Sequence, residues 1–112
     1  MQNIFENNPV ALATITKFGT PNIIGVTGVK IVDNQVIITD NYMRQTKEDI
    51  ENNENVCLIS WDKNLNGYKV IGKAKHYSGG KWLKFVKALP ENKDYPAKGA
   101  VVAKIDKIIK LK

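Results

Sequence analysis

Most of the chain consists of short runs rich in β-branched and other apolar residues, separated by residues that favour turns. The clearest turn signals are Gly19-Thr20-Pro21, Asp33-Asn34 and Ser78-Gly79-Gly80. The pattern predicts six β-strands, over residues 10–18, 22–31, 36–39, 55–61, 68–77 and 99–111.

Two of these runs carry further information. Residues 55–61 are almost continuously apolar, which is typical of a buried central strand. Residues 22–31 contain Gly25 and Gly28, and a glycine inside a strand often marks a bulge or a close approach by backbone or ligand. We therefore expect 55–61 inside the sheet and an irregularity within 22–31.

Two segments have the pattern of short helices. Residues 43–53 contain few β-formers and few apolar residues, which predicts a helix at the surface. Within 81–89 the apolar residues follow the spacing i, i+3, i+4 and i+7 of one helical face, and a proline ends the segment. These apolar residues are Trp82, Phe85, Val86 and Leu89.

The elements follow the order β-β-β-α-β-β-α-β, which favours antiparallel pairing over parallel βαβ units. A chain of 112 residues and 12.5 kDa has room for one domain, which we expect to span 1–112. The expected fold class is mainly β: a small six-stranded antiparallel barrel with two short helices that plug or flank it.

Composition excludes several classes of protein. With 43% hydrophobic and 25% charged residues the chain falls in the ordinary globular range. No run approaches the about 20 apolar residues of a membrane span, and residues 1–8 lack the features of a secretion signal. The single cysteine, Cys57, rules out an internal disulfide and is expected to behave as a small buried hydrophobe. We expect a cytoplasmic protein without membrane contact.

The side chains of metal sites and of nucleophilic catalysis are scarce. His76 is the one histidine, there is no CxxC motif, and neither a P-loop nor a GxGxxG motif occurs. We therefore expect no metal site and take His76 as a surface or structural residue. No catalytic residue is assigned.

The net charge of +6 comes entirely from the last third of the chain. Residues 1–80 carry eight basic and eight acidic side chains, whereas residues 81–112 carry nine lysines and three acids. A solvated lysine face is the simplest interpretation, and attraction of nucleic acid or of an acidic partner is the alternative.

The segment 39–47 combines a strand end, a polar loop and the expected start of a helix. The first N–H groups of a helix lack internal acceptors and carry partial positive charge. The only arginine of the chain, Arg44, stands at this helix start together with Thr46 and Lys47. A guanidinium, a hydroxyl and an ammonium beside free amides outline a phosphate site, and a solvated first turn with incidental charges is the alternative.

From this segment outward the chain resembles the pyridoxamine 5′-phosphate oxidase-like FMN-binding split-barrel family. The resemblance covers roughly residues 10–77 and extends to a last strand at 99–111. Its most distinctive pieces are Leu12-Ala13-Thr14 with the turn at 19–21, the helix start at 44–46 leading into Ile50-Glu51-Asn52-Asn53, and Val70-Ile71-Gly72-Lys73-Ala74. The short chain is most similar to the small FMN-binding proteins of this fold.

The resemblance implies a homodimer that binds FMN at the subunit interface. It assigns the FMN phosphate to the helix start, the flavin ring to the second strand, and the ribityl chain or ring edge to the end of the third. It also implies that Tyr68 reaches the cofactor from the partner chain. Trp61 is either a residue that stacks near the cofactor or a buried structural tryptophan. The residues thus implied are Val26, Thr27, Gly28, Thr39, Asp40, Arg44, Gln45, Thr46, Lys47, Trp61 and Tyr68.

Two departures from the family pattern limit what it implies. Gln45 replaces a basic residue that many members carry at the phosphate position, which lowers the expected phosphate affinity unless Lys47 compensates. The chain also ends short of the substrate-binding extension of the vitamin B6 oxidase, so we do not expect that reaction.

The function expected is that of an FMN flavoprotein acting in electron transfer, with a redox partner protein, or as a flavin-dependent oxidoreductase. The alternatives are a nucleic-acid-binding barrel that uses the lysine-rich end and a cofactor-free interaction barrel. Against nucleic acid, Trp82 and Phe85 have the spacing of packing residues.

Overall fold

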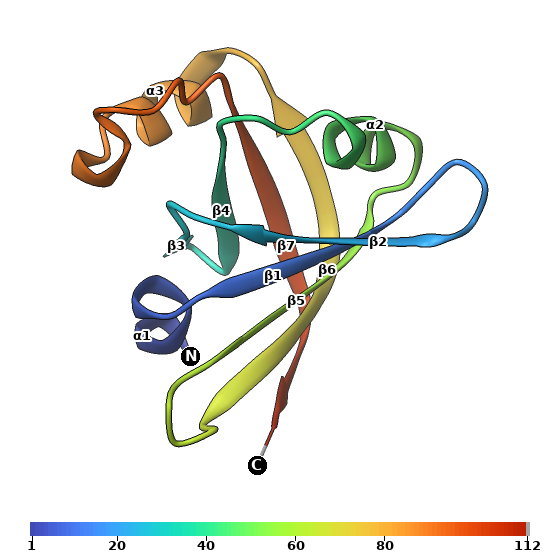
Figure 1. The fold of residues 1–112 in the computed structure, drawn as a ribbon, viewed down its shortest axis with the longest axis vertical. Coiled ribbons are helices and arrows are strands. Elements are labelled where there is room, and N and C mark those ends of the chain that lie inside the picture. The colour runs from blue at the N-terminus through green and yellow to red at the C-terminus, as the bar shows by residue number, and fades with distance from the viewer. Residues whose placement is uncertain (112) are drawn as a thin grey trace.

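A computed structural model describes residues 1–111 of the chain, which form one strongly curled antiparallel sheet with helices at its ends and side (Figure 1). The seven strands are β1 (Val10–Ile15), β2 (Pro21–Val26), β3 (Lys30–Val32), β4 (Gln35–Asp40), β5 (Asn55–Trp61), β6 (Gly67–Tyr77) and β7 (Gly99–Lys110). They pair in the order β2-β1-β5-β6-β7-β4-β3. Since β2 and β3 do not pair with each other, the sheet is curled but not closed.

Three α-helices and one 3-10 helix accompany the sheet. They are α1 (Gln2–Asn7), α2 (Gln45–Asn52), α3 (Gly80–Lys87) and the 3-10 helix η1 (Pro90–Asn92). α2 and α3 match the two expected helices in place. α1 was not expected, because six residues with two adjacent apolar side chains show no helical period. None of the described helices is long and apolar enough to cross a membrane.

The run 22–31, expected as one strand, is divided between the two edges of the sheet. β2 pairs with β1 at one edge, and β3 pairs with β4 at the other. The chain changes direction at Gly28, whose φ is +59°. The prediction of six strands and two helices is therefore wrong in number, whereas the mainly β antiparallel class is confirmed.

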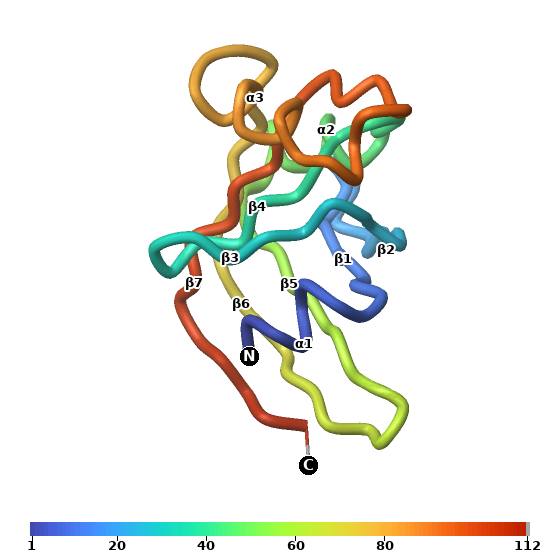
Figure 2. Tube along the Cα trace, turned by 90° about the vertical axis from the view of Figure 1, so that its left-hand side faces the viewer, coloured from blue at the N-terminus to red at the C-terminus, as the bar shows by residue number. Residues whose placement is uncertain are grey.

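Helices close the interior of the curled sheet. Phe5 of α1 and Ile50 of α2 are both buried in the main core, together with the inward side chains of β1, β5 and β6. α3 packs instead on the outside of β4 and β7, where Val86 joins Ile37 and Val102 in a second cluster. Figure 2 shows α2 and α3 near one end of the molecule and α1 nearer the other.

The outward side of β1 and β5 is largely apolar and is covered by none of the described helices, whereas on the neighbouring β6 the outward residues include Lys69 and Lys73 beside Ile71. Cα partners across β2, β1, β5 and β6 place Ile23, Ala13, Cys57 and Ile71 in one row. Cys57 is therefore half-buried on this side and not enclosed as expected. We call Ala11, Ala13, Ile23, Cys57, Ile59, Trp61 and Ile71 the outer apolar face.

An ion pair between β3 and η1 gives the fold a small pH dependence. Lys30 Nζ lies 2.9 Å from Glu91 Oε2, and the Lys30 hydrogen bond holds the pKa of Glu91 below its ordinary value of 4.5. The stabilisation is present above that ordinary value and is lost as the pH falls through the lowered pKa.

We expect Lys30→Ala to lower the free energy of unfolding by less than about 1 kcal/mol near neutral pH, because solvent screens this half-exposed pair. The difference from wild type should shrink in acid, as urea unfolding at several pH values would measure. Lys17→Ala, which breaks the more exposed pair with Glu48, is the control. A Lys30→Ala effect that grows with acidity would contradict the assignment.

Candidate cofactor site

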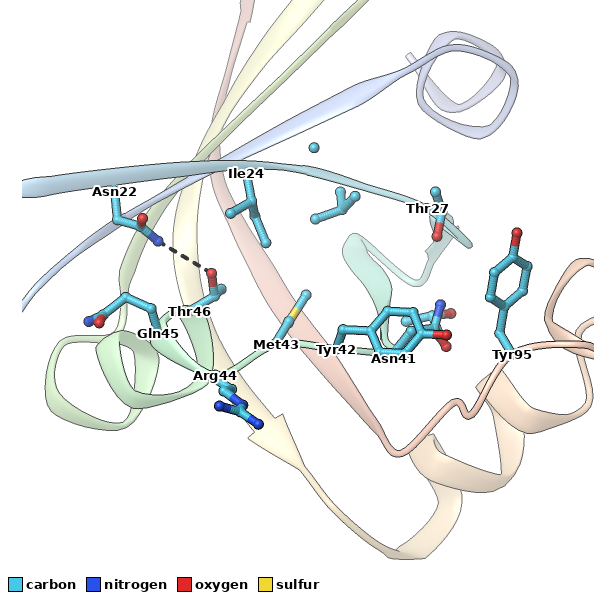
Figure 3. A pocket seen from close by; sticks show the side chains of 13 residues that line it. Asn22, Ile24, Thr27, Asn41, Tyr42, Met43, Arg44, Gln45, Thr46 and Tyr95 are labelled. Atoms are coloured by element: carbon cyan, nitrogen blue, oxygen red, sulfur yellow. Dashed lines mark hydrogen bonds between the residues drawn. The ribbon is translucent and has the colours of Figure 1, made fainter.

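A cavity of about 590 Å³ lies between β2 and the segment 41–46 that leads from β4 into α2. Tyr95, from the loop between η1 and β7, lines it at one end (Figure 3). Cavities of roughly 300–1,000 Å³ are the usual size for small-molecule sites. The cavity has a polar end at the start of α2 and a second end near Thr27 and Tyr95.

The polar end is formed by the N-terminus of α2. Arg44 is the N-cap residue, and no side chain caps the helix. The backbone N–H groups of the first turn therefore have neither an intrahelical acceptor nor a capping oxygen. Arg44, Gln45 and Thr46 all line the cavity here, and Arg44 is exposed. Free amides and the helix dipole favour an anionic group at this end. Figure 3 shows the Arg44 side chain on the side of the segment that faces away from β2, where it adds positive charge beside the helix start.

A hydrogen-bond network fixes the side chains behind this end. Asn22 Nδ2 donates to Thr46 Oγ1 and to Thr14 Oγ1, at 3.3 Å each. The fully buried Asp49 accepts from Thr14 Oγ1 at 2.7 Å and from Gln45 Nε2 at 2.6 Å. Gln45 is neutral and adds no charge to the cavity, and its amide is held by Asp49.

The second end of the cavity carries aromatic and polar side chains that the sequence did not single out. Tyr42 and Tyr95 line it and are 74% and 54% exposed. Asn41 lines it as well, and its Oδ1 accepts from the N–H of Ala97 at 2.9 Å. Tyr42 and Asn41 stand in the segment 39–47 that the sequence had marked. Tyr95 precedes Pro96 in a stretch without periodicity, so no sequence signal indicated it.

The structure brings six of the eleven residues assigned from the sequence to this cavity. Those lining it are Val26, Thr27, Thr39, Arg44, Gln45 and Thr46. Gly28 follows Thr27 in the chain and Lys47 follows Thr46, but neither of the two lines the cavity. Gly28 borders a separate cavity beside α1. Asp40 is fully buried beneath the segment 41–46 and faces His76 of β6.

Trp61 and Tyr68 lie at the other end of the sheet, on the β5–β6 hairpin (Figures 1 and 2). Trp61 lines a smaller apolar hollow of about 380 Å³ with Ile59, Leu65 and Leu111. Tyr68 packs against the main core. Within one chain neither residue lines the cavity, so a contact with its ligand requires a second subunit.

The residues present fit a flavin mononucleotide. Its dianionic phosphate matches the uncapped helix start with Arg44, and the hydroxyls of its ribityl chain match the hydroxyl and amide groups of Asn22, Thr39 and Thr46. The cavity volume is of the size that such a ligand needs. The cavity thus fits FMN in the chemical groups that line it and in its volume.

Sequence comparison places the chain among known proteins. A family model described as pyridoxamine 5′-phosphate oxidase matches residues 1–112. An uncharacterized protein of Methanocaldococcus jannaschii is 34% identical over 117 aligned positions, which cover all of this chain and 78% of that protein.

Solved structures share the fold at lower identity. HupZ of Group A Streptococcus has a TM-score of 0.91 at 24% identity, over 99% of this chain and 90% of that one. An FMN-binding protein of Syntrophomonas wolfei has a TM-score of 0.80 at 18% identity, over 99% of this chain and 83% of that one. With the full-length family match, these findings show that the chain belongs to the pyridoxamine 5′-phosphate oxidase family.

Proposed function

We propose that the protein binds FMN non-covalently in the cavity between β2 and α2 and acts as a flavoprotein in electron transfer or flavin-dependent oxidoreduction. The observation that carries the proposal is the pairing of a cavity of about 590 Å³ with an uncapped helix start and the single arginine at one end. Membership of the family, in which a protein of the same fold is named as FMN-binding, supports it.

The residues of the chain supply binding and orientation in this proposal. Arg44 and the first amides of α2 hold the phosphate, and Thr46, fixed by Asn22, lies beside them. The backbone at Val26, the last residue of β2, and at Thr27 borders the ring, and Lys47 adds positive charge from outside the cavity. Bound FMN would supply the redox chemistry itself. No protein acid or base is required, in agreement with the absence of a nucleophile–base set in the sequence.

The proposal includes a homodimer. β5 is apolar on both sides, since Val56 and Leu58 point into the core whereas Cys57 and Ile59 point outward. A strand apolar on both sides is typical of a strand covered on both sides, and a second copy offers the same apolar surface in a two-fold arrangement. A dimer also supplies Trp61 and Tyr68 from the partner subunit. The single cysteine suits the cytoplasm, where we place the protein.

The direct test is to purify the protein, record flavin absorbance, and titrate the ligand-free form with FMN and with riboflavin. Arg44→Ala should raise the dissociation constant for FMN about 10- to 100-fold, the range for losing a charged hydrogen-bond donor to phosphate. Riboflavin, which has no phosphate, should bind both forms alike. Lys47→Ala is the matched control and should have the smaller effect, because Lys47 does not line the cavity.

Equal FMN binding by wild type and Arg44→Ala would refute the phosphate assignment. A colourless protein that responds to neither FMN, haem nor a deazaflavin would favour a cofactor-free interaction barrel instead.

A further inference from the structure

Asp40, the last residue of β4, is a fully buried carboxylate that does not line the proposed FMN cavity. Its Oδ2 lies 2.6 Å from Nε2 of His76 on β6. Its Oδ1 accepts from the backbone N–H of Met43 at 2.8 Å. His76 is buried as well, with 3% of its side chain exposed. The pair therefore joins the middle of the sheet to the residue that immediately precedes the helix cap Arg44.

Lys98 holds the same peptide segment from the other side. Its Nζ donates to the carbonyl oxygen of Met43 at 2.9 Å and lies 4.0 Å from Oδ1 of Asp40. Its backbone N–H donates to the carbonyl oxygen of Asp40 at 2.9 Å. Both backbone polar groups of Met43 are thus bound, one by Asp40 and the other by Lys98. The direction in which the chain enters α2 is fixed by these contacts.

Gly99 leaves the space that the histidine ring occupies. A Cβ built on Gly99 would lie 2.7 Å from Cε1 and 2.8 Å from Nε2 of His76. Ser78 Oγ lies 3.5 Å from the other ring nitrogen, Nδ1. Any side chain at position 99 would therefore push the ring away from Asp40.

We propose that His76 and Asp40 are positioning residues for the anion-binding end of the cavity: they hold Met43 so that Arg44 and the first amides of α2 face the ligand. An ionised carboxylate can only accept hydrogen bonds, so Nε2 of His76 is the donor. Without that donor the buried Oδ2 of Asp40 loses the hydrogen bond of His76, and only Oδ1 keeps a partner. Leaving a buried carboxylate oxygen without its hydrogen bond is costly. We expect the Asp40 side chain then to turn towards solvent and to release the backbone amide of Met43. The consequence for FMN rests on the proposed function, whereas the effect on the Met43 amide does not.

The experiment compares His76→Leu, which removes the donor, with His76→Gln, which keeps an N–H donor on a side chain of similar reach. In the ligand-free protein, amide hydrogen exchange is measured at Met43 and at Asn53. The Asn53 amide donates to Asp49 O at 2.7 Å at the other end of α2 and is the internal reference. Because His76 is the only histidine, its ring resonances report directly whether the ring stays in place.

For His76→Leu we expect exchange at Met43 to rise at least about tenfold relative to Asn53, and the FMN dissociation constant to rise about tenfold, as the loss of one hydrogen bond to a charged group would give. Riboflavin affinity should stay within about twofold, since it has no phosphate to be positioned. His76→Gln should restore both measurements towards wild type. Gly99→Ala keeps both residues but displaces the ring, and should behave like His76→Leu.

Equal exchange at Met43 in wild type and His76→Leu would overturn the proposal. So would a rise of the same size at Met43 and Asn53, because that pattern indicates a general loss of stability, and so would a failure of His76→Gln to differ from His76→Leu. If His76→Leu does not fold, Gly99→Ala decides by the same measurements. If wild type binds no FMN, the proposed function fails, and the exchange measurements still test the positioning role.

Discussion

Gly28→Ala should lower the free energy of unfolding by about 2–4 kcal/mol. A residue with a side chain in a left-handed backbone conformation costs about 1–2 kcal/mol. The overlap of the new methyl group with its buried neighbours costs a similar amount or more. Gly28 has φ of +59° and joins the two edges of the sheet. A Cβ there would overlap the Thr39 hydroxyl and lie 3.1 Å from Asn92 Oδ1.

These neighbours cannot easily give way. Thr39 is buried, its Oγ1 donates to the carbonyl oxygen of Gly28 at 3.2 Å, and it accepts from Asn92 Nδ2 at 2.8 Å. Asn92 Nδ2 also donates to the carbonyl oxygen of Val86 at 2.8 Å. A methyl group at position 28 therefore disturbs a buried polar network that links β4, η1 and α3.

Urea unfolding of Gly28→Ala beside Gly25→Ala measures the effect. Gly25 lies in the same run of sequence, has no positive φ, and a Cβ built on it meets no atom within 4 Å. Its replacement should change the free energy of unfolding by no more than about 0.5 kcal/mol. If the two variants are equally stable, the contact of Gly28 with Thr39 and Asn92 is not tight.

The glycines of 22–31 illustrate what the sequence could and could not predict. An irregularity was expected there, and the structure has one at Gly28. That the two halves lie at opposite edges of the sheet was not predicted. Each half pairs with its neighbour in sequence, β2 with β1 and β3 with β4. The two hairpins are separated because β1 pairs with β5 and β4 pairs with β7, which lie far along the chain. A local pattern reports the break but not these long-range pairings.

The residues of the site also divide into those that the sequence could place and those that it could not. The helix start at Arg44 depends on local sequence, so its position beside a cavity could be anticipated. Asp40, which the resemblance implies near the ribityl chain or ring edge, is fully buried with its carboxylate against His76. From Val36 to Asp40 every residue of β4 is buried, so its period of two does not reveal which side chains face the cavity. Tyr95 comes from an irregular loop that pattern analysis does not cover.

The apolar run 55–61 has a second explanation, which becomes clear only from the sheet topology. It was taken as the sign of a buried strand, and β5 is indeed central, between β1 and β6. One side of β5 faces the main core. On the other side Trp61 is 44% exposed, and Ile71 of the neighbouring β6 is 38% exposed. The sequence of β5 is thus that of a strand covered on both sides, while one chain covers only the inner side.

Ile59→Glu should therefore convert the proposed dimer into a monomer, with a dissociation constant at least about 100-fold higher, since removing a charged group from water into an apolar contact costs several kcal/mol even where a basic side chain lies opposite. Within one chain the new carboxylate lies opposite Lys69, the Cα partner of residue 59, so the monomer keeps its fold. Sedimentation measures the mass, and unfolding in urea checks the stability.

FMN affinity should fall together with dimerisation, because Trp61 and Tyr68 reach the cavity only from a partner subunit in the proposed arrangement. Phe18→Glu is the control: Phe18 is 81% exposed in the turn between β1 and β2, outside the outer apolar face, and should change neither mass nor affinity. If Ile59→Glu sediments like wild type, the outer apolar face is not the subunit contact. If it is monomeric yet binds FMN with wild-type affinity, one chain alone completes the site and the roles of Trp61 and Tyr68 are wrong.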